Sequence, residues 1–323
     1  MNNKSSGLRL ISIVIPCYNE GVNVSSFYRL LSKIIDSDKK HFYELVYVDD
    51  GSNDNTLIEL ENISKLSNRV KVLSLSRNFG KEIATSAGIF YSKGDATIII
   101  DGDGQHPAEL IPELVRIWEE GYQVVIGVRE SNQKEGLVKR YGSLLFYKLF
   151  NSTSGANLVP GATDFRLIDK EVSDEFKQFT ERYRITRGLI DWMGYRRTYL
   201  PFNANERMGG KSSYKISKLL KLALNSFVSL SMVPLYAIGY VGAFITITSF
   251  LGGLFIIIEQ LILSDPLGLN LTGTAMLSIM MMFLVGIILV SQGLVSIYLS
   301  HIHVQTQQRP LFIVNRKTSI NVD

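Results

Sequence analysis

The sequence has very little cysteine. Cys17 is the only cysteine among 323 residues, which excludes an intramolecular disulfide and a zinc site built from several cysteines. Only 20% of the residues are charged and 8 are proline, which excludes a disordered or collagen-like chain. No G-x-G-x-x-G follows the first apolar run, and no G-x-x-x-x-G-K-[ST] occurs anywhere. The main sequence evidence for a dinucleotide-dependent oxidoreductase or a P-loop protein is therefore missing.

Charge is missing from two long stretches in the C-terminal third. Residues 222–258 and 266–308 contain no Asp, Glu, Lys or Arg. About 20 apolar residues form a helix long enough to cross a hydrocarbon core of about 30 Å. The pattern predicts two transmembrane helices, at 235–258 and 274–299, with two core helices of a soluble protein as the alternative. Lys and Arg flank the pair but are absent from the connector 259–273, which predicts that both ends are cytoplasmic.

A basic segment precedes the first predicted span. Lys215, Lys218 and Lys221 recur on one side of a helix, which predicts an amphipathic helix on the inner leaflet. A solvated linker helix is the alternative. The expected divisions of the chain are a soluble domain at 1–205, an interfacial loop and helix at 206–233, two spans within 234–300, and a cytoplasmic tail at 301–323.

The first 200 residues alternate short β-branched runs with amphipathic stretches of helical length. Strands are expected at 10–15, 43–48, 70–75, 96–100 and 123–127, and helices at 22–35, 56–66, 81–92 and 107–120. Such alternation predicts an α/β domain with a doubly wound, mostly parallel sheet. Sheets of this kind bind ligands beyond the carboxyl ends of their strands.

Acidic residues follow three of the predicted strands. Asp49 and Asp50 end the second strand, and Asp101 and Asp103 follow the fourth, while Glu20 comes shortly after the first. Carboxylates repel phosphate unless a cation lies between them, so the D-x-D pair suits Mg²⁺ or Mn²⁺ bridging a diphosphate. The D-G-D-G sequence alone also makes an ordinary tight turn. Three acidic strand ends on one sheet edge favour the functional interpretation.

These motifs, in this order, resemble the family 2 glycosyltransferases, which have the Rossmann-like GT-A fold. The similarity is greater to the polyprenyl-phosphate glycosyltransferases, namely dolichyl-phosphate mannose synthases and bactoprenol glucosyltransferases. The matching segments are 14–20, 48–54, 77–82, 101–107, 163–167, 207–214 and 309–312. Gly102 and Gly104 depart from the pattern, because relatives often carry Ala and Leu there. The departure makes the turn more flexible and removes no ligand.

The resemblance implies a role for each of several residues. Donor binding is expected at Pro16, Tyr18, Asn19, Glu20, Asp49, Asp50, Lys81, Asp101 and Gly102. The divalent metal is expected at Asp101, Asp103 and Gln105, and the acceptor phosphate at Arg129, Arg140, Arg207, Lys211 and Ser212.

Some of these roles have structural alternatives. Asp164 is expected near the reacting centre as the catalytic carboxylate, with a salt bridge to Arg166 as its alternative. Asp49 and Asp50 could instead cap the helix that follows. His106 is interpreted as structural, because the following Pro107 indicates the start of a helix.

The implied reaction is an inverting, metal-dependent transfer of glucose from UDP-glucose to a polyprenyl phosphate such as undecaprenyl phosphate. It is expected at the cytoplasmic leaflet of a bacterial inner membrane, in a homo-oligomer. GDP-mannose and UDP-N-acetylglucosamine are alternative donors, and a non-catalytic sugar-nucleotide-binding scaffold is an alternative class. A processive synthase lacks support, since Asp191 and not Arg precedes Trp192. Nucleic acid is not an expected partner, because the basic clusters flank the membrane segment.

Overall fold

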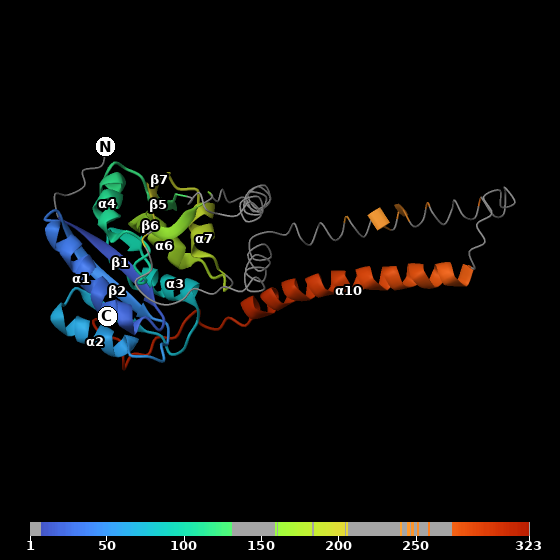
Figure 1. The fold of residues 1–323 in the computed structure, drawn as a ribbon, viewed down its shortest axis with the longest axis horizontal. Helices are drawn as coiled ribbons and strands as arrows, with labels where there is room; N and C mark the ends of the chain where they lie inside the picture. The colour runs from blue at the N-terminus through green and yellow to red at the C-terminus, as the bar shows by residue number, and fades with distance from the viewer. Residues whose placement is uncertain are drawn as a thin grey trace. The chain divides into compact units, whose positions relative to one another are not determined.

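The computed structural model describes residues 8–130, 161–203 apart from Tyr183, and 273–322, with a few isolated positions between them (Figure 1). The chain divides into two units. One comprises residues 1–215 together with 309–323, and the other comprises residues 216–308. The predicted amphipathic helix, most of the predicted first span and nearly all of its connector lie outside the described residues.

The first unit contains a seven-stranded sheet in the order β3-β2-β1-β4-β6-β5-β7. Its strands are β1 (Arg9–Cys17), β2 (His41–Asp49), β3 (Val70–Ser74), β4 (Ala96–Ile99), β5 (Val124–Arg129), β6 (Ala162–Asp169) and β7 (Arg197–Phe202). Strand β6 is antiparallel to both β4 and β5, whereas every other pairing is parallel. The predicted mostly parallel α/β sheet is therefore confirmed, with β6 as the exception.

The helices occupy two layers, one on each face of this sheet. They are α1 (Gly21–Ser37), α2 (Thr56–Leu66), α3 (Lys81–Tyr91), the 3-10 turn η1 (Ala108–Leu110), α4 (Ile111–Glu119), α6 (Lys170–Gln178) and α7 (Thr186–Trp192). The helix predicted from residue 107 begins as α4 only at Ile111. Pro112 lies in the first turn of α4, where a missing N–H costs nothing.

Alternation along β1 explains the two layers. Ile11, Ile13 and Ile15 pack in one core cluster with apolar residues of α1, α2 and α4. Val14 faces the opposite side and packs with Ala84 of α3. Successive side chains of a strand point to opposite faces, so an uninterrupted apolar run marks a strand that is buried on both sides.

Helix α10 (Gly273–Thr306) belongs to the second unit and contains the predicted second span. Within it, residues 283–306 are long enough to cross a membrane and contain an 18-residue window with a mean hydropathy of 2.0. Among the described residues this is the one helix that meets those conditions by length and composition. The two-helix hairpin stays a prediction.

Residues 309–322, called here the C-terminal strap, belong to the first unit and pack against its sheet. Ile320 forms an antiparallel bridge with Val72 of β3, and Val314 forms one with Leu75 just beyond β3. Part of the segment that the sequence suggested as a tail thus pairs with the edge of the sheet through two isolated bridges.

Close packing of α3 on β1 yields a stability prediction. A Cβ atom at Gly88 would lie 2.2 Å from Cγ1 of Val14, which is fully buried. Gly88→Ala is expected to destabilise the protein by about 1–2 kcal/mol, because overpacking costs about 1–3 kcal/mol and exceeds the helix-propensity gain of up to about 1 kcal/mol. The thermal unfolding midpoint of the detergent-solubilised protein should fall by roughly 2–8 °C. An unchanged or higher midpoint would show that the gain in helix propensity equals or exceeds the cost of overpacking.

Candidate active site

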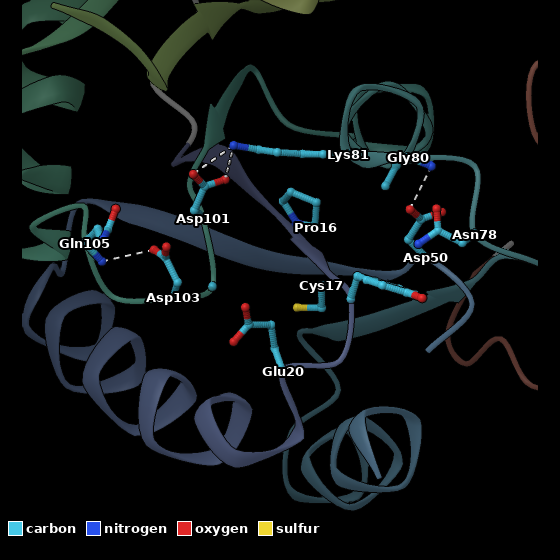
Figure 2. Close-up of a pocket in the computed structure, with 13 residues that line it drawn as sticks. Pro16, Cys17, Glu20, Asp50, Asn78, Gly80, Lys81, Asp101, Asp103 and Gln105 are labelled. Carbon is cyan, nitrogen blue, oxygen red and sulfur yellow. Dashed lines mark hydrogen bonds and ion pairs between the residues drawn. The ribbon is translucent and has the colours of Figure 1, made fainter. Parts of the chain in front are cut away.

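A pocket of about 420 Å³ lies beyond the carboxyl ends of β1, β2 and β4 (Figure 2). It brings together most of the residues predicted for the donor and the metal. These are Pro16, Tyr18, Glu20, Asp50, Lys81, Asp101, Gly102, Asp103 and Gln105. The lining also includes four residues that sequence reasoning did not assign, namely Cys17, Asn78, Gly80 and Ala84. Asn78 and Gly80 belong to the motif at 77–82, and this motif was the sequence signal from which their place in the site could have been predicted.

Asp50 is almost fully buried, and its two carboxylate oxygens hold a backbone loop. The N–H of Phe79 donates to Oδ1 at 2.7 Å, and the N–H of Gly80 donates to Oδ2 at 2.8 Å. Burial raises the pKa of Asp50, and these two hydrogen bonds oppose the rise. Asp50 therefore shapes the wall of the pocket, whether or not it also contacts a ligand.

Asp49 and Asn19 do not line the pocket but connect the loops beneath it. Asp49 accepts a hydrogen bond from the N–H of Ser52 at 3.2 Å. Asn19 has a φ of 54°, and its N–H donates to Oγ of Ser52 at 3.0 Å while its Oδ1 accepts from Asn53 at 2.9 Å. The loop that follows β1 is thus joined to the loop that follows β2.

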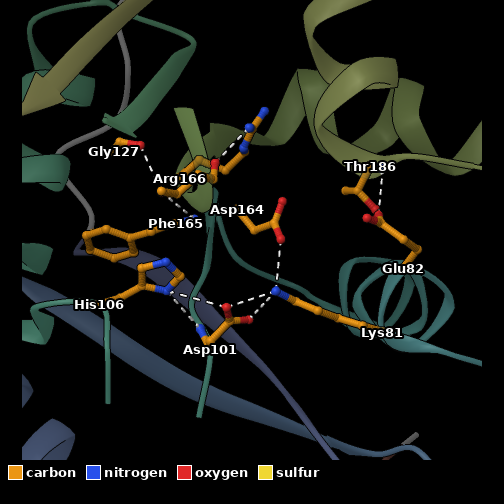
Figure 3. Close-up of polar contacts among 10 residues, drawn as sticks. Lys81, Glu82, Asp101, His106, Gly127, Asp164, Phe165, Arg166 and Thr186 are labelled. Atoms are coloured by element: carbon orange, nitrogen blue, oxygen red, sulfur yellow. Dashed lines mark hydrogen bonds and ion pairs between the residues drawn. The ribbon is translucent and has the colours of Figure 1, made fainter. Parts of the chain in front are cut away.

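Lys81 lies between two carboxylates from different strands (Figure 3). Its Nζ is 2.7 Å from Oδ1 of Asp101, which follows β4, and 2.8 Å from Oδ2 of Asp164 in β6. Arg166, the alternative partner of Asp164, pairs instead with Asp191 at 3.6 Å. The salt bridge considered for Asp164 is therefore made with Lys81.

This arrangement sets the charge state of the site. Burial alone would raise the pKa of Asp164, but the ammonium of Lys81 outweighs it and holds that pKa well below its usual range. The carboxylates of Asp164 and Asp101 likewise raise the pKa of Lys81 against the effect of its burial. The carboxylate of Asp164 and the ammonium of Lys81 are therefore both charged at neutral pH. The side chain of Lys81 is 45% exposed, so water screens the pair and limits its contribution to stability.

Asp101, Asp103 and Gln105 are the three residues that were predicted to hold a divalent cation. All three line the pocket, and the backbone N–H of Gln105 donates to Oδ1 of Asp103 at 3.1 Å, which orders the turn. No three His, Cys, Asp or Glu side chains form a metal-binding group among the described residues. Two carboxylates and one amide oxygen suit Mg²⁺ or Mn²⁺, which complete their shell with phosphate and water.

His106 has the structural role that was expected. It is 8% exposed, and its ring stacks on Phe165 with centroids 5.4 Å apart and meets the edge of Phe202 at 5.9 Å. Burial lowers the pKa of His106, so the ring is neutral at pH 7.

A buried polar layer that the sequence did not reveal lies behind Asp164. Glu82 accepts a hydrogen bond from the N–H of Thr186 at 2.7 Å, which ties α3 to α7 (Figure 3). Arg166 is 1% exposed and donates to the carbonyl of Thr163 at 2.9 Å. These contacts fix the backbone on both sides of Asp164.

Of the residues predicted for the acceptor phosphate, the structure describes only Arg129. It ends β5 and its side chain is exposed, while its backbone N–H donates to the carbonyl of Gly161 at 2.9 Å. The remaining predicted residues lie outside the described part of the chain, namely Arg140, Arg207, Lys211 and Ser212.

The comparison with known protein families decides the class of the molecule. The family model described as glycosyl transferase family 2 matches residues 12–177. The chain belongs to glycosyl transferase family 2. It is therefore a transferase enzyme, and the resemblance inferred from its motifs is confirmed. The matched region contains every residue of the pocket and Asp164.

Several curated members of the family align over nearly their whole length. An uncharacterized glycosyltransferase of Synechocystis is 39% identical over 305 residues, covering 94% of each chain. The bactoprenol glucosyl transferase of Shigella phage SfV is 33% identical over 307 residues, covering 95% of this chain and 98% of its own. A prophage bactoprenol glucosyl transferase homolog of Escherichia coli is 32% identical over 306 residues, covering 95% and 98%.

Solved structures with a similar fold include glucosyl-3-phosphoglycerate synthase from Mycobacterium tuberculosis in complex with Mn²⁺, UDP and glucosyl-3-phosphoglycerate. Its TM-score is 0.48 at 18% identity, and the alignment covers 69% of this chain and 78% of that one.

The pairing of Lys81 with two carboxylates yields a prediction about pH. A carboxylate whose pKa is lowered by folding stabilises the fold above its unfolded pKa of about 3.9, and this contribution is lost as the pH falls through the folded pKa. Lys81→Met should therefore lower the thermal midpoint at pH 7, and its difference from the wild type should shrink below about pH 4. Lys81→Arg, which keeps the charge, is the control. An equal difference at pH 7 and pH 3 would contradict the ion-pair interpretation.

Proposed function

We propose that this glycosyltransferase transfers glucose, with inversion, from UDP-glucose to undecaprenyl phosphate at the cytoplasmic leaflet of a bacterial inner membrane. The observation that carries the proposal is the alignment with relatives named bactoprenol glucosyl transferase, which extends over 95% of this chain. An alignment of that length includes the pocket and the apolar helix α10. It supports a shared acceptor class as well as a shared fold.

The pocket has the chemical features that a nucleoside diphosphate sugar requires. Tyr18 is 42% exposed at the pocket, where its ring is available to stack on a base. Asn78 adds an amide that can donate and accept hydrogen bonds. Lys81 supplies a positive charge beside Asp101 and Asp164. We assign the nucleoside to the part of the pocket near Tyr18 and Asn78. We assign the diphosphate and the sugar to the part near Lys81.

The leaving diphosphate needs its charge offset. A divalent cation held by Asp101, Asp103 and Gln105 would neutralise the negative charge that develops there. The ammonium of Lys81 is half-exposed and remains protonated, because two carboxylates raise its pKa. When a phosphate enters, the same ammonium is available to donate hydrogen bonds to its oxygens.

The chemical step moves one sugar between two phosphates. The bond from C1 of glucose to the diphosphate oxygen breaks, and UDP leaves with the bonding electron pair. An oxygen of the lipid phosphate forms the new bond to C1 from the opposite face. A lipid monophosphate is already ionised at pH 7, so no strong base is needed. The lowered pKa of Asp164 makes it a weak base, and we assign it the positioning of Lys81.

Membrane attachment belongs to the same proposal. Residues 283–306 of α10 are long and apolar enough to span a bilayer. A membrane-bound enzyme meets a polyprenyl phosphate at the leaflet where its head group lies. This proposal also includes the hairpin topology, a homo-oligomer, and an acceptor site formed by Arg140, Arg207, Lys211 and Ser212.

A donor panel tests the reaction. The purified full-length protein, undecaprenyl phosphate and a divalent metal should form a lipid heavier by one hexose with UDP-glucose, with equal release of UDP. Mass spectrometry of the extracted lipid measures the product, and GDP-mannose and UDP-N-acetylglucosamine are the alternative donors. Binding of all three nucleotide sugars with no glycolipid would favour the scaffold alternative.

Loss of one metal-site carboxylate tests the cation site. Asp103→Asn should leave the thermal midpoint within a few degrees of the wild type and reduce transfer at least about tenfold, because a neutral amide binds a divalent cation poorly. Titration with Mn²⁺ in the presence of UDP should show weaker metal binding. Glu109→Gln removes an exposed carboxylate from the nearby turn η1 and serves as the control. Unchanged Mn²⁺ affinity in Asp103→Asn would remove this residue from the site.

A further inference from the structure

We propose that the C-terminal strap is a positioning element of the donor pocket. It holds the loop at 75–80, which forms one wall of the pocket, and it follows α10 directly in the sequence. The proposal rests on the assignment of this pocket to a nucleotide sugar. It adds that part of the donor site is fixed by residues that come after the predicted membrane span.

The strap completes the sheet at the open edge of β3. The N–H of Val72 donates to the carbonyl of Ile320 at 3.0 Å, and the N–H of Ile320 donates back at 2.8 Å. Near the end of β3, the N–H of Asn315 donates to the carbonyl of Ser74 at 2.8 Å. The strap therefore satisfies backbone groups that an uncovered edge strand would expose to water.

Side chains of the strap anchor it on α3. The ring of Phe312 lies 6.1 Å from that of Phe90 and 6.3 Å from that of Tyr91. Phe312 and Val314 pack against the core cluster that contains Ala84, which itself lines the pocket. The strap is thus joined by apolar contacts to the helix that carries Lys81.

The same segment holds the loop after β3. The N–H of Ser76 donates to the carbonyl of Ile313 at 2.9 Å. Two residues later Asn78 lines the pocket. The N–H groups of Phe79 and Gly80 then donate to Asp50, and Figure 2 shows the bond from Gly80. The loop is therefore fixed at one end by the strap and at the other by Asp50.

The fit of this loop leaves little tolerance for movement. A Cβ atom at Gly51, whose φ is +65°, would lie 2.4 Å from the backbone carbonyl carbon of Arg77. The backbone of the loop at 75–80 is thus in close contact with the turn at Gly51 that follows β2. If the strap is released, the wall loses its attachment to the strap, and we expect weaker nucleotide binding as the result.

Two substitutions in the full-length, detergent-solubilised protein separate this role from general stability. Phe312→Ala removes the aromatic anchor, and Asn315→Pro removes the N–H that donates to Ser74. Ile313→Ala is the matched control, because the side chain of Ile313, next to Phe312, is apolar and 53% exposed. Each variant is measured by calorimetry with UDP and with GDP, and by hydrogen exchange of the backbone amides.

Phe312→Ala and Asn315→Pro should each raise the Kd of the nucleotide that the wild type binds by about 2- to 10-fold, the factor that corresponds to one hydrogen bond. The amides of Phe79 and Gly80 should exchange faster, while those of β1 should not change. Ile313→Ala should match the wild type in both measurements.

Two results would overturn the proposal. One is unchanged exchange at Phe79 and Gly80 in both variants, and the other is an equal acceleration across the whole sheet, which indicates a structural role alone. If the wild type binds neither UDP nor GDP, the assigned donor class fails. Hydrogen exchange still reports on the strap in that case, so the two failures are distinguishable.

Discussion

Repulsion between carboxylates that converge at one sheet edge is the constraint on which the site depends. Asp101 and Asp164 can lie side by side because Lys81 places an ammonium within 2.8 Å of each. Without a cation between them, one carboxylate would take up a proton or turn away. Lys81 offsets this repulsion with its own positive charge, and Asp101 lines the pocket beyond the carboxyl ends of the strands.

The antiparallel strand β6 creates this convergence. Ile99 of β4 pairs with Arg166 of β6, and the two strands run in opposite directions. Asp101, two residues after Ile99, and Asp164, two residues before Arg166, therefore meet at the same edge. In a wholly parallel sheet the start of β6 would lie at the far edge. The buried Arg166 and Asp191 pair holds the strand from behind, so the position of Asp164 depends on contacts with α7 as well as with β4.

The sequence predicted those features that depend on a local pattern of residues. Apolar runs located β1 to β5, and acidic residues after them located the pocket. It did not predict that Asp50 holds a loop, because its partners are backbone N–H groups some 30 positions away in the chain. It also did not predict the strap. Val314 and Ile320 pair with a strand about 240 residues earlier, and their segment lacks the alternation that indicates a strand. The segment at 309–312 contributed to the family resemblance, but a short motif does not reveal its partner.

The strap has a consequence for the order of events during synthesis. The ribosome makes β1 to β7 first, then the apolar residues, and only afterwards residues 309–322 that close the edge of β3. Domains generally fold as units while the chain emerges, and an unpaired strand edge is exposed to wrong partners until it is covered. This domain cannot complete its sheet until the apolar segment has left the ribosome. The pocket wall at 75–80 therefore gains its contact with the strap only after the whole apolar segment has been synthesised, which makes this contact one of the last to form in the domain.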